Sequence, residues 1–163
     1  MQITYEPIGI ITSPHKQMEG IPIQSRGATG IRGSITIYPP FLEGLQDLEG
    51  FSHLILIYHF HLSEGYELQP TPFLDTKPHG VFATRAPRRP NPIGFSIVRL
   101  IRIREHVLEI ENVDILDGTP LLDIKPYVPQ FDIVGVERSG WLENKGENIG
   151  EIRSDRRFQS KKD

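Results

Sequence analysis

Hydrophobic and polar residues alternate along several short segments of this 163-residue chain. The clearest case is 31–38, where isoleucines alternate with Arg32, Ser34 and Thr36 before Pro39 follows. A period of two is typical of a strand with one buried face, and proline ends such a strand because it cannot continue the hydrogen-bond ladder. We therefore expect a half-buried strand at 31–38.

Other segments have the β-branched and aromatic composition of strands. They are residues 3–11, 51–60, 95–104, 107–111, 121–124 and 134–137. The most apolar of them, 51–60, is too short for a buried helix, so we expect it at the centre of the sheet. The segments 95–104 and 107–111 are expected to form a hairpin that turns at Glu105 and His106.

Helical periodicity is clear at one place. Phe41, Leu45 and Leu48 follow two prolines at i, i+4 and i+7, a pattern that predicts one short amphipathic helix. The summed pattern predicts a mainly β fold, either a small antiparallel β-barrel or a strongly curved sheet, with one short helix and long irregular loops. We expect residues 1–141 to form this β domain and 142–163 to form a polar C-terminal tail.

Composition supports a loop-rich fold. Glycine and proline together make up 29 of the 163 residues, which argues against a helical bundle. Many of the prolines fall in 68–92, where we expect an irregular loop with short extended pieces such as 80–84. A long irregular loop in a compact domain is usually either functional or disordered.

Several classes of protein are excluded or disfavoured. The chain has no cysteine, which excludes disulfides, zinc–thiolate sites, iron–sulfur clusters and a cysteine nucleophile. No run of 18 apolar residues occurs, so we expect no membrane span. Residues 1–7 lack a basic start followed by an apolar run, so we expect no signal peptide and a cytoplasmic location.

Charge is unevenly distributed. The net charge is −3, yet the segment 85–104 holds six arginines and no acidic residue. A mildly acidic protein with such a segment can still present a basic face to a polyanion. Alternatively, the fold brings carboxylates to these arginines. Arg102 and Arg104 alternate with isoleucines, so we expect both to face outward.

A pair of histidines raises the question of a metal. His59 and His61 would share one face of a strand, and Glu64, His53 and His79 could complete a ligand set. Alternatively, one histidine faces a pocket and the others are ordinary core or surface residues.

Two segments carry more specific patterns. Residues 80–94 combine prolines, which stiffen an irregular loop, with Arg and Asn donors and a final Gly94 that permits close backbone approach. Residues 116–127 contain an Asp117-Gly118 turn and then Asp123, Lys125 and Tyr127, which could line a polar pocket. The chain has no phosphate-binding loop, no Rossmann fingerprint and no Gly-x-Ser-x-Gly elbow.

Together with residues 13–16 (Ser-Pro-His-Lys), these two segments closely resemble the signature regions of the TsaA-like family, the TrmO-type tRNA methyltransferases. Members of this family are S-adenosylmethionine-dependent enzymes built on a small β-barrel and are generally homodimers. Their characterised activity is methylation of the exocyclic nitrogen of threonylcarbamoyl-adenosine, next to the anticodon of threonine tRNA. The resemblance therefore implies S-adenosylmethionine as cofactor, a tRNA anticodon stem-loop as partner, and a homodimer.

The resemblance also implies site residues. Those expected to bind cofactor are Pro14, His15, Lys16, His61, Leu62, Arg85, Phe95, Asp117, Gly118 and Thr119. Asn91, Asp123 and Tyr127 also match motif positions, and we assign them catalytic roles. A ureido-like nitrogen is a poor nucleophile while protonated, so a base is expected near it, with Asp117, Asp123 and Tyr127 as candidates.

Two other functions stay open. One is a metal-dependent small-molecule enzyme that uses His59, His61 and Glu64. The other is a non-catalytic domain that binds S-adenosylmethionine or RNA.

Overall fold

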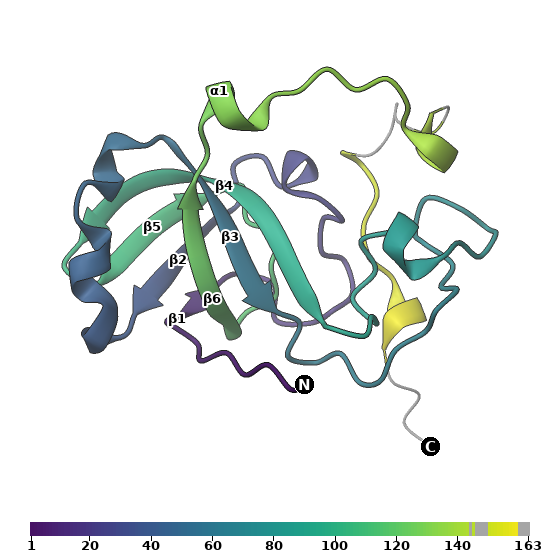
Figure 1. The fold of residues 1–163 in the computed structure, drawn as a ribbon, viewed down its shortest axis with the longest axis horizontal. Coiled ribbons are helices and arrows are strands. Elements are labelled where there is room, and N and C mark those ends of the chain that lie inside the picture. The colour runs from purple at the N-terminus through teal and green to yellow at the C-terminus, as the bar shows by residue number, and fades with distance from the viewer. Residues whose placement is uncertain (144, 146–149, 160–163) are drawn as a thin grey trace.

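The computed structural model describes residues 1–143, 145 and 150–159. These residues form a closed barrel of six antiparallel strands (Figure 1). The strands are β1 (Gly9–Thr12), β2 (Arg32–Ile37), β3 (His53–His59), β4 (Ile93–Arg104), β5 (Val107–Glu111) and β6 (Thr119–Pro126). Their order round the barrel is β1-β2-β5-β4-β3-β6, and β6 pairs again with β1. The predicted mainly β fold with an antiparallel barrel is confirmed.

The barrel core follows from the period-two pattern. In β3, Leu54, Leu56 and Tyr58 are buried while the residues between them are partly exposed. Ile35 of β2 and Leu121 of β6 are fully buried in the same cluster. Because alternate side chains of a strand point to opposite faces, each strand contributes one apolar row to this interior.

The predicted β4–β5 hairpin is present. Glu105 turns the chain with a left-handed φ of 53°, and Leu100 pairs with Ile110 and Arg104 with Val107. A register shift after Leu100 marks a bulge, which increases the local twist that closure of a barrel requires.

In the described part of the chain, short helical turns lie between the strands and after β6. They are the 3-10 helices η1 (Ser25–Gly27), η2 (Pro39–Leu45), η3 (Leu48–Gly50), η4 (Val81–Ala83), η5 (Gly140–Leu142) and η7 (Arg156–Phe158), with one α-helical turn, α1 (Pro129–Asp132). The amphipathic helix predicted around Phe41, Leu45 and Leu48 is instead split into η2 and η3. Asp47 adopts a left-handed φ of 64°, which a right-handed helix cannot accommodate.

Three predicted extended segments differ from the structure. The first strand begins at Gly9 rather than residue 3, because Pro7 has no N–H to donate to a ladder. Residues 80–84 contain the turn η4 rather than an extended piece. Residues 134–137 are not a strand, and Val134 and Val136 are more than 70% exposed because no neighbouring strand among the described residues pairs with them.

The irregular segments gather beside the barrel. Figure 1 shows the loop between β3 and β4 and the yellow C-terminal segment, residues 150–159, lying together on one side. Ser154 joins this segment to the loop after β1, accepting a hydrogen bond from the Gly20 N–H and donating its own N–H to Ile21, both at 2.8 Å. The division of the chain at residue 141 stays a prediction, but this part of the expected tail packs against the rest of the chain.

Among the described residues, no helix has the length and apolar character needed to cross a membrane.

Candidate functional site

A cavity of about 300 Å³ lies between the barrel and the irregular segments. Its wall comes from the loop after β1, the ends of β3 and β4, the proline-rich loop, the segment before β6, and the C-terminal segment. Five of the residues expected to bind cofactor line it: His61, Leu62, Arg85, Phe95 and Thr119. The chain thus brings together residues from four separate stretches of sequence at one concave surface, the usual form of a small-molecule site.

Gly94 shapes one wall of this cavity. A Cβ atom at Gly94 would lie 2.4 Å from Cε2 of Tyr58 and 2.7 Å from Cζ of Phe60, closer than any side chain could tolerate. The two aromatic rings contact each other edge to face, 5.5 Å apart, and both line the cavity. The glycine after Pro92-Ile93 is therefore required by the packing of these rings.

Arg85 presents a cation at the cavity. Its guanidinium lies 4.6 Å above the ring of Phe95 and donates a hydrogen bond to Gln24 Oε1 at 2.6 Å. The neighbouring Arg89 instead donates to the backbone carbonyl of Thr84 at 3.1 Å and so fixes the loop from within. Arg85 is exposed, so its planar fork can bind an anionic group of a ligand.

The Asp117 turn lies just behind the cavity wall. Asp117 accepts a hydrogen bond from the Ser13 N–H at 2.9 Å and pairs with Lys16 Nζ at 2.7 Å. The Lys16 ammonium, followed by the Ser13 N–H, holds the pKa of Asp117 below its usual range. Gly118 has a left-handed φ of 72° and donates to the carbonyl of Ile11 at 2.9 Å. The turn is thereby anchored to the first strand.

The remaining residues of the early motif join the same cluster. His15 Nε2 lies 2.9 Å from the carbonyl oxygen of Val113, and the His15 carbonyl accepts from the Asp117 N–H at 2.8 Å. Pro14, His15, Lys16, Asp117 and Gly118 therefore lie together next to the cavity, although the residues that line it directly are Leu116 and Thr119 on either side of the turn.

His61 and Thr119 lie side by side in the cavity wall. Thr119 Oγ1 donates to the carbonyl of Leu116 at 2.7 Å and lies 3.4 Å from His61 Nδ1. Burial, followed by the nearby His59, lowers the pKa of His61. A neutral imidazole at this position can both accept and donate hydrogen bonds to a ligand.

Sequence analysis missed two polar residues of the cavity, the buried Tyr58 and the partly buried Asp114. Tyr58 and Asp114 both line it, and the Tyr58 hydroxyl lies 3.0 Å from the Ser96 hydroxyl. Burial raises the pKa of both groups. In the sequence, the position of Asp114 between the aliphatic residues Val113 and Ile115, both buried in the structure, is the feature that could have indicated it.

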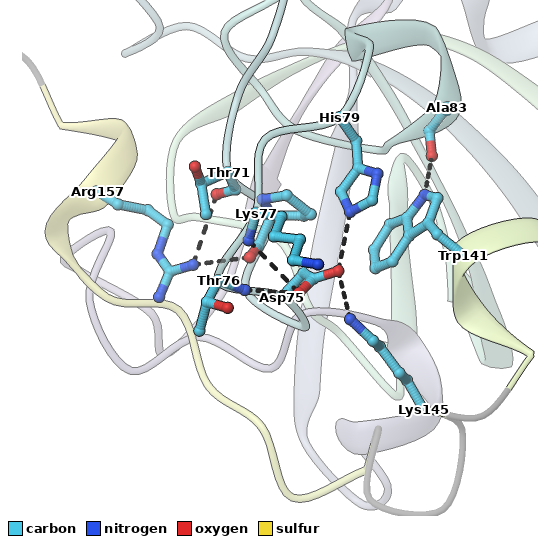
Figure 2. Close-up of polar contacts among 10 residues, drawn as sticks. Thr71, Asp75, Thr76, Lys77, His79, Ala83, Trp141, Lys145 and Arg157 are labelled. Carbon is cyan, nitrogen blue, oxygen red and sulfur yellow. Dashed lines mark hydrogen bonds and ion pairs between the residues drawn. The ribbon is translucent and has the colours of Figure 1, made fainter.

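A polar cluster holds the C-terminal part of the chain against the proline-rich loop (Figure 2). Asp75 accepts hydrogen bonds from His79 Nε2 at 2.9 Å and from Lys145 Nζ. The His79 ring stacks on the Trp141 ring with 4.5 Å between centroids, and the Trp141 N–H donates to the Ala83 carbonyl at 2.8 Å. We call Asp75, His79, Trp141 and Lys145 the Asp75 clasp.

The C-terminal segment itself forms part of the cavity wall through Ser154, Asp155 and Phe158. Phe158 is 5% exposed and packs edge to face on Phe73, with 5.0 Å between ring centroids. Arg157, labelled in Figure 2, donates to the backbone carbonyl of Pro72 at 2.7 Å. Sequence analysis expected a polar tail and gave no indication that it reaches this site.

The three residues assigned catalytic roles lie elsewhere. Asp123 pairs with Lys125 at 2.7 Å, and both side chains are about half exposed. A register shift in β6 between Leu121 and Asp123 turns this pair away from the core. Tyr127 contacts His53, at the opposite end of β3 from the cavity.

Asn91 precedes β4 and accepts a hydrogen bond from the Ile93 N–H through its carbonyl. Asn91, Asp123 and Tyr127 are not among the described residues that line the cavity, and their roles stay predictions.

His59 and His61 lie near each other, but the other histidines considered as metal ligands do not join them. His53 and His59 are at the two ends of β3, and His79 belongs to the Asp75 clasp. Over the described ranges of the chain, no three His, Cys, Asp or Glu side chains gather closely enough to hold a metal ion.

The outward-facing arginines of β4 are paired with acidic residues of β5. Glu109 binds Arg102 at 2.7 Å and Arg104 at 3.8 Å. Glu111 similarly binds Arg99 at 3.3 Å and Arg32 at 3.8 Å. The fold thus brings carboxylates to these arginines, as the second interpretation of the basic segment expected.

Comparison with known proteins matches this chain to one family. The model of the tRNA-methyltransferase O N-terminal domain matches residues 10–133. A "probable S-adenosyl-L-methionine-binding protein" of Pyrococcus abyssi is 53% identical over 98% of this chain and 87% of its own length. The tRNA (adenine(37)-N6)-methyltransferase of Escherichia coli is 38% identical over 77% of this chain.

Solved structures agree. The crystal structure of TrmO from Pseudomonas aeruginosa superposes with a TM-score of 0.73 and 41% identity over 86% of this chain. The chain spans 63% of that structure and 57% of the Escherichia coli enzyme. The match covers all six strands of the barrel apart from the first residue of β1, together with the residues of the cavity that come before β6. The chain therefore belongs to the family of the tRNA-methyltransferase O N-terminal domain.

Proposed function

We propose that this chain is an S-adenosylmethionine-dependent methyltransferase that acts on the N6 nitrogen of the adenosine next to the anticodon of tRNA. The observation that carries the proposal is the convergence of His61, Leu62, Arg85, Phe95 and Thr119 on one cavity. Relatives of this family are named both as S-adenosylmethionine-binding proteins and as tRNA (adenine(37)-N6)-methyltransferases.

The residues of the cavity fit this cofactor chemically. S-adenosylmethionine would supply a methyl group whose transfer releases a neutral thioether. Arg85 offers a planar cation for the carboxylate of the cofactor, and the apolar wall with Phe60 and Leu62 suits its purine ring. Asp117, fixed by Lys16 and the Ser13 N–H, would orient the turn that carries Thr119. Such positioning can supply most of the acceleration in a displacement of this kind.

The finer substrate assignment is also part of the proposal. We propose threonylcarbamoyl-adenosine as the acceptor, in an anticodon stem-loop, and a cytoplasmic homodimer as the active form. An exposed apolar stretch supports a second copy, since Phe131, Ile133, Val134 and Val136 are each at least 67% exposed. Asn91, Asp123 and Tyr127 lie outside the cavity, so their proposed catalytic roles require RNA or the second copy to lie against the outside of the barrel.

Methyl transfer from radiolabelled S-adenosylmethionine tests the proposal. We expect label in threonine tRNA that carries threonylcarbamoyl-adenosine and none in the same transcript without the modification. Arg85→Ala should lower the single-turnover rate about a hundredfold, because a displacement of about 1 Å can cost that much. Arg138→Ala, at an exposed position outside the cavity lining, is the matched control.

Other results would identify the alternatives. Tight cofactor binding with no transfer to any tRNA would indicate a non-catalytic binding domain. A stoichiometric metal that is needed for activity on a small molecule would indicate the histidine-based enzyme.

A further inference from the structure

A carboxylate in the cavity wall is not explained by any contact described above. Asp114 lies between β5 and β6, where the fully buried Val113 and the nearly buried Ile115 on either side fix its backbone. Its side chain lines the cavity, yet Oδ1 is enclosed and has no hydrogen-bond partner within the described ranges. Leaving a buried acceptor unsatisfied costs free energy, which suggests that this group serves a ligand or a reaction.

The surroundings of Asp114 raise its affinity for a proton. Burial raises its pKa, and the hydroxyls of Ser96 and Ser25, followed by the charge of His15, only partly offset this effect. Tyr58 faces it from β3, and Arg85 lines the same cavity from the proline-rich loop.

Asp117, three residues further along the chain, has the opposite pKa shift. Lys16 stabilises its ionised form and so lowers its pKa. A carboxylate with a raised pKa takes up a proton near neutral pH far more readily than a salt-bridged one.

A second pocket adjoins the cavity at this point. It has a volume of about 450 Å³, and Gln24, Arg85 and Phe95 line both spaces. Ser25 and Ser96, the two hydroxyl neighbours of Asp114, line the second pocket. Asp114 is therefore placed in the wall that separates the two spaces.

The second pocket has the chemistry of a nucleotide site. Arg26 offers a cation for phosphate, Asn112 is an amide at its edge, and Phe95 offers an aromatic ring against which a base can pack. Single-stranded RNA is recognised by this combination of stacking and charged donors. The pocket thus fits an unstacked nucleotide of an RNA loop.

We propose that the second pocket holds the acceptor nucleotide and that Asp114 is the general base of the methyl transfer. The proposal rests on the proposed function, since it needs a methyl donor in the first cavity. As the bond from N6 to the methyl carbon forms, the carbon–sulfur bond breaks and its electron pair stays on sulfur. The proton of N6 passes to the carboxylate of Asp114.

Asp114→Asn is the decisive variant, and Asp47→Asn on an exposed turn is its matched control. We expect Asp114→Asn to lower the single-turnover rate at least about a hundredfold, the usual contribution of a general base. Cofactor affinity measured by calorimetry should change far less than the rate, because Asn keeps the size of a side chain that lines the cofactor cavity and loses only the proton acceptor. Asp47→Asn should match the wild type in both measurements.

Two readouts do not depend on activity. The ¹³C shift of the Asp114 carboxyl in the cofactor-free protein should titrate above the ordinary aspartate value of about 4. Asp114→Asn should raise the midpoint of thermal unfolding at pH 7, since ionised Asp114 destabilises the fold, and this gain should shrink as the pH falls through the pKa of Asp114.

Ser25→Ala, which removes one hydroxyl that lowers this pKa, should move the acid limb of the pH–rate profile to higher pH. It keeps the test open if Asp114→Asn does not fold. A folded Asp114→Asn that transfers methyl at the wild-type rate, or a Ser25→Ala profile that does not move, would overturn the assignment of the base alone. A wild-type chain that binds cofactor but methylates no tRNA would overturn the proposed function itself.

Discussion

The barrel and the layer of loops beside it are held together by different forces. In the barrel, backbone ladders join neighbouring strands, and side chains such as Leu56 and Ile35 fill the interior with no exposed surface. In the layer, side chains bind backbone carbonyls, as Arg157 does at Pro72 and Trp141 at Ala83. The difference indicates that the barrel sets global stability, while the layer shapes the cavity and can open without unfolding the barrel.

The largest expected effect comes from the barrel. Leu56→Ala removes a fully buried side chain from the middle of β3 and leaves a cavity in close-packed surroundings. We expect a loss of about 3 kcal/mol in the free energy of unfolding, measured by urea titration. Leu42→Ala, at a partly exposed position in η2, should cost much less. Equal losses for the two variants would contradict the assignment of global stability to the barrel.

Phe158, in the layer of loops, should affect cofactor affinity more than global stability. Phe158→Ala removes the contact with Phe73 and part of the cavity wall. We expect the dissociation constant of S-adenosylmethionine to rise about tenfold, or about 1.4 kcal/mol. The global unfolding free energy should change less than for Leu56→Ala, because the segment opens locally.

Calorimetry and hydrogen exchange measure these two quantities. Phe41→Ala in η2, outside the cavity lining, is the control for cofactor affinity. A large global loss with unchanged affinity would mean that the C-terminal segment belongs to the stability of the barrel instead.

The Asp75 clasp should resist mild acid because its carboxylate stays ionised. Hydrogen bonds from Lys145, then from His79, hold the pKa of Asp75 far below its usual range. A depressed pKa means that the clasp is stabilising above the unfolded pKa of about 4 and is lost as the pH falls through the lower folded value. Acidification from pH 7 to 4 should therefore leave the clasp closed.

Asp75→Asn should open the clasp at neutral pH. Trp141 is the sole tryptophan of the chain, so its emission reports the clasp directly. We expect a red shift of this emission in Asp75→Asn, with circular dichroism of the barrel unchanged. Asp47→Asn is the matched control. Emission that shifts only together with loss of the barrel signal would show that clasp and barrel unfold as one unit.

Sequence reasoning succeeded for the barrel because period two is a local property. The strand at 31–38 and the hairpin at Glu105 need only neighbouring residues to be recognised. The layer depends on pairs far apart in sequence, such as Arg157 with Pro72, separated by 85 residues, and neither partner signals the other. Turns such as that at Asp47 were missed because a single left-handed residue overrides helical periodicity.

The site was predicted in the same uneven way. Resemblance to known motifs identified His61, Arg85 and Thr119, which meet at the cavity. The same motif also pointed to Asp123, which lies outside the cavity. One register shift in β6 reverses the face of the strand on which this residue lies. Asp114 was missed because an acidic residue between two aliphatic ones is a common surface pattern, and its burial arises only when the barrel closes.

The smallest expected effect concerns the basic strand of the barrel. Arg102 and Arg104 share Glu109 as a partner and remain half exposed, so much of their charge is already balanced. Two free arginines on phosphate would each contribute about 0.9 to the salt slope of tRNA binding. We expect the Arg102→Ala/Arg104→Ala double variant to lower the slope by clearly less than two and to shift thermal stability little, since exposed ion pairs contribute little.

Arg26→Ala, in the second pocket, should lower the slope by about one on its own. Binding measured over a series of salt concentrations compares them directly. A larger change for the double variant than for Arg26→Ala would place the RNA along β4 rather than over the cavity.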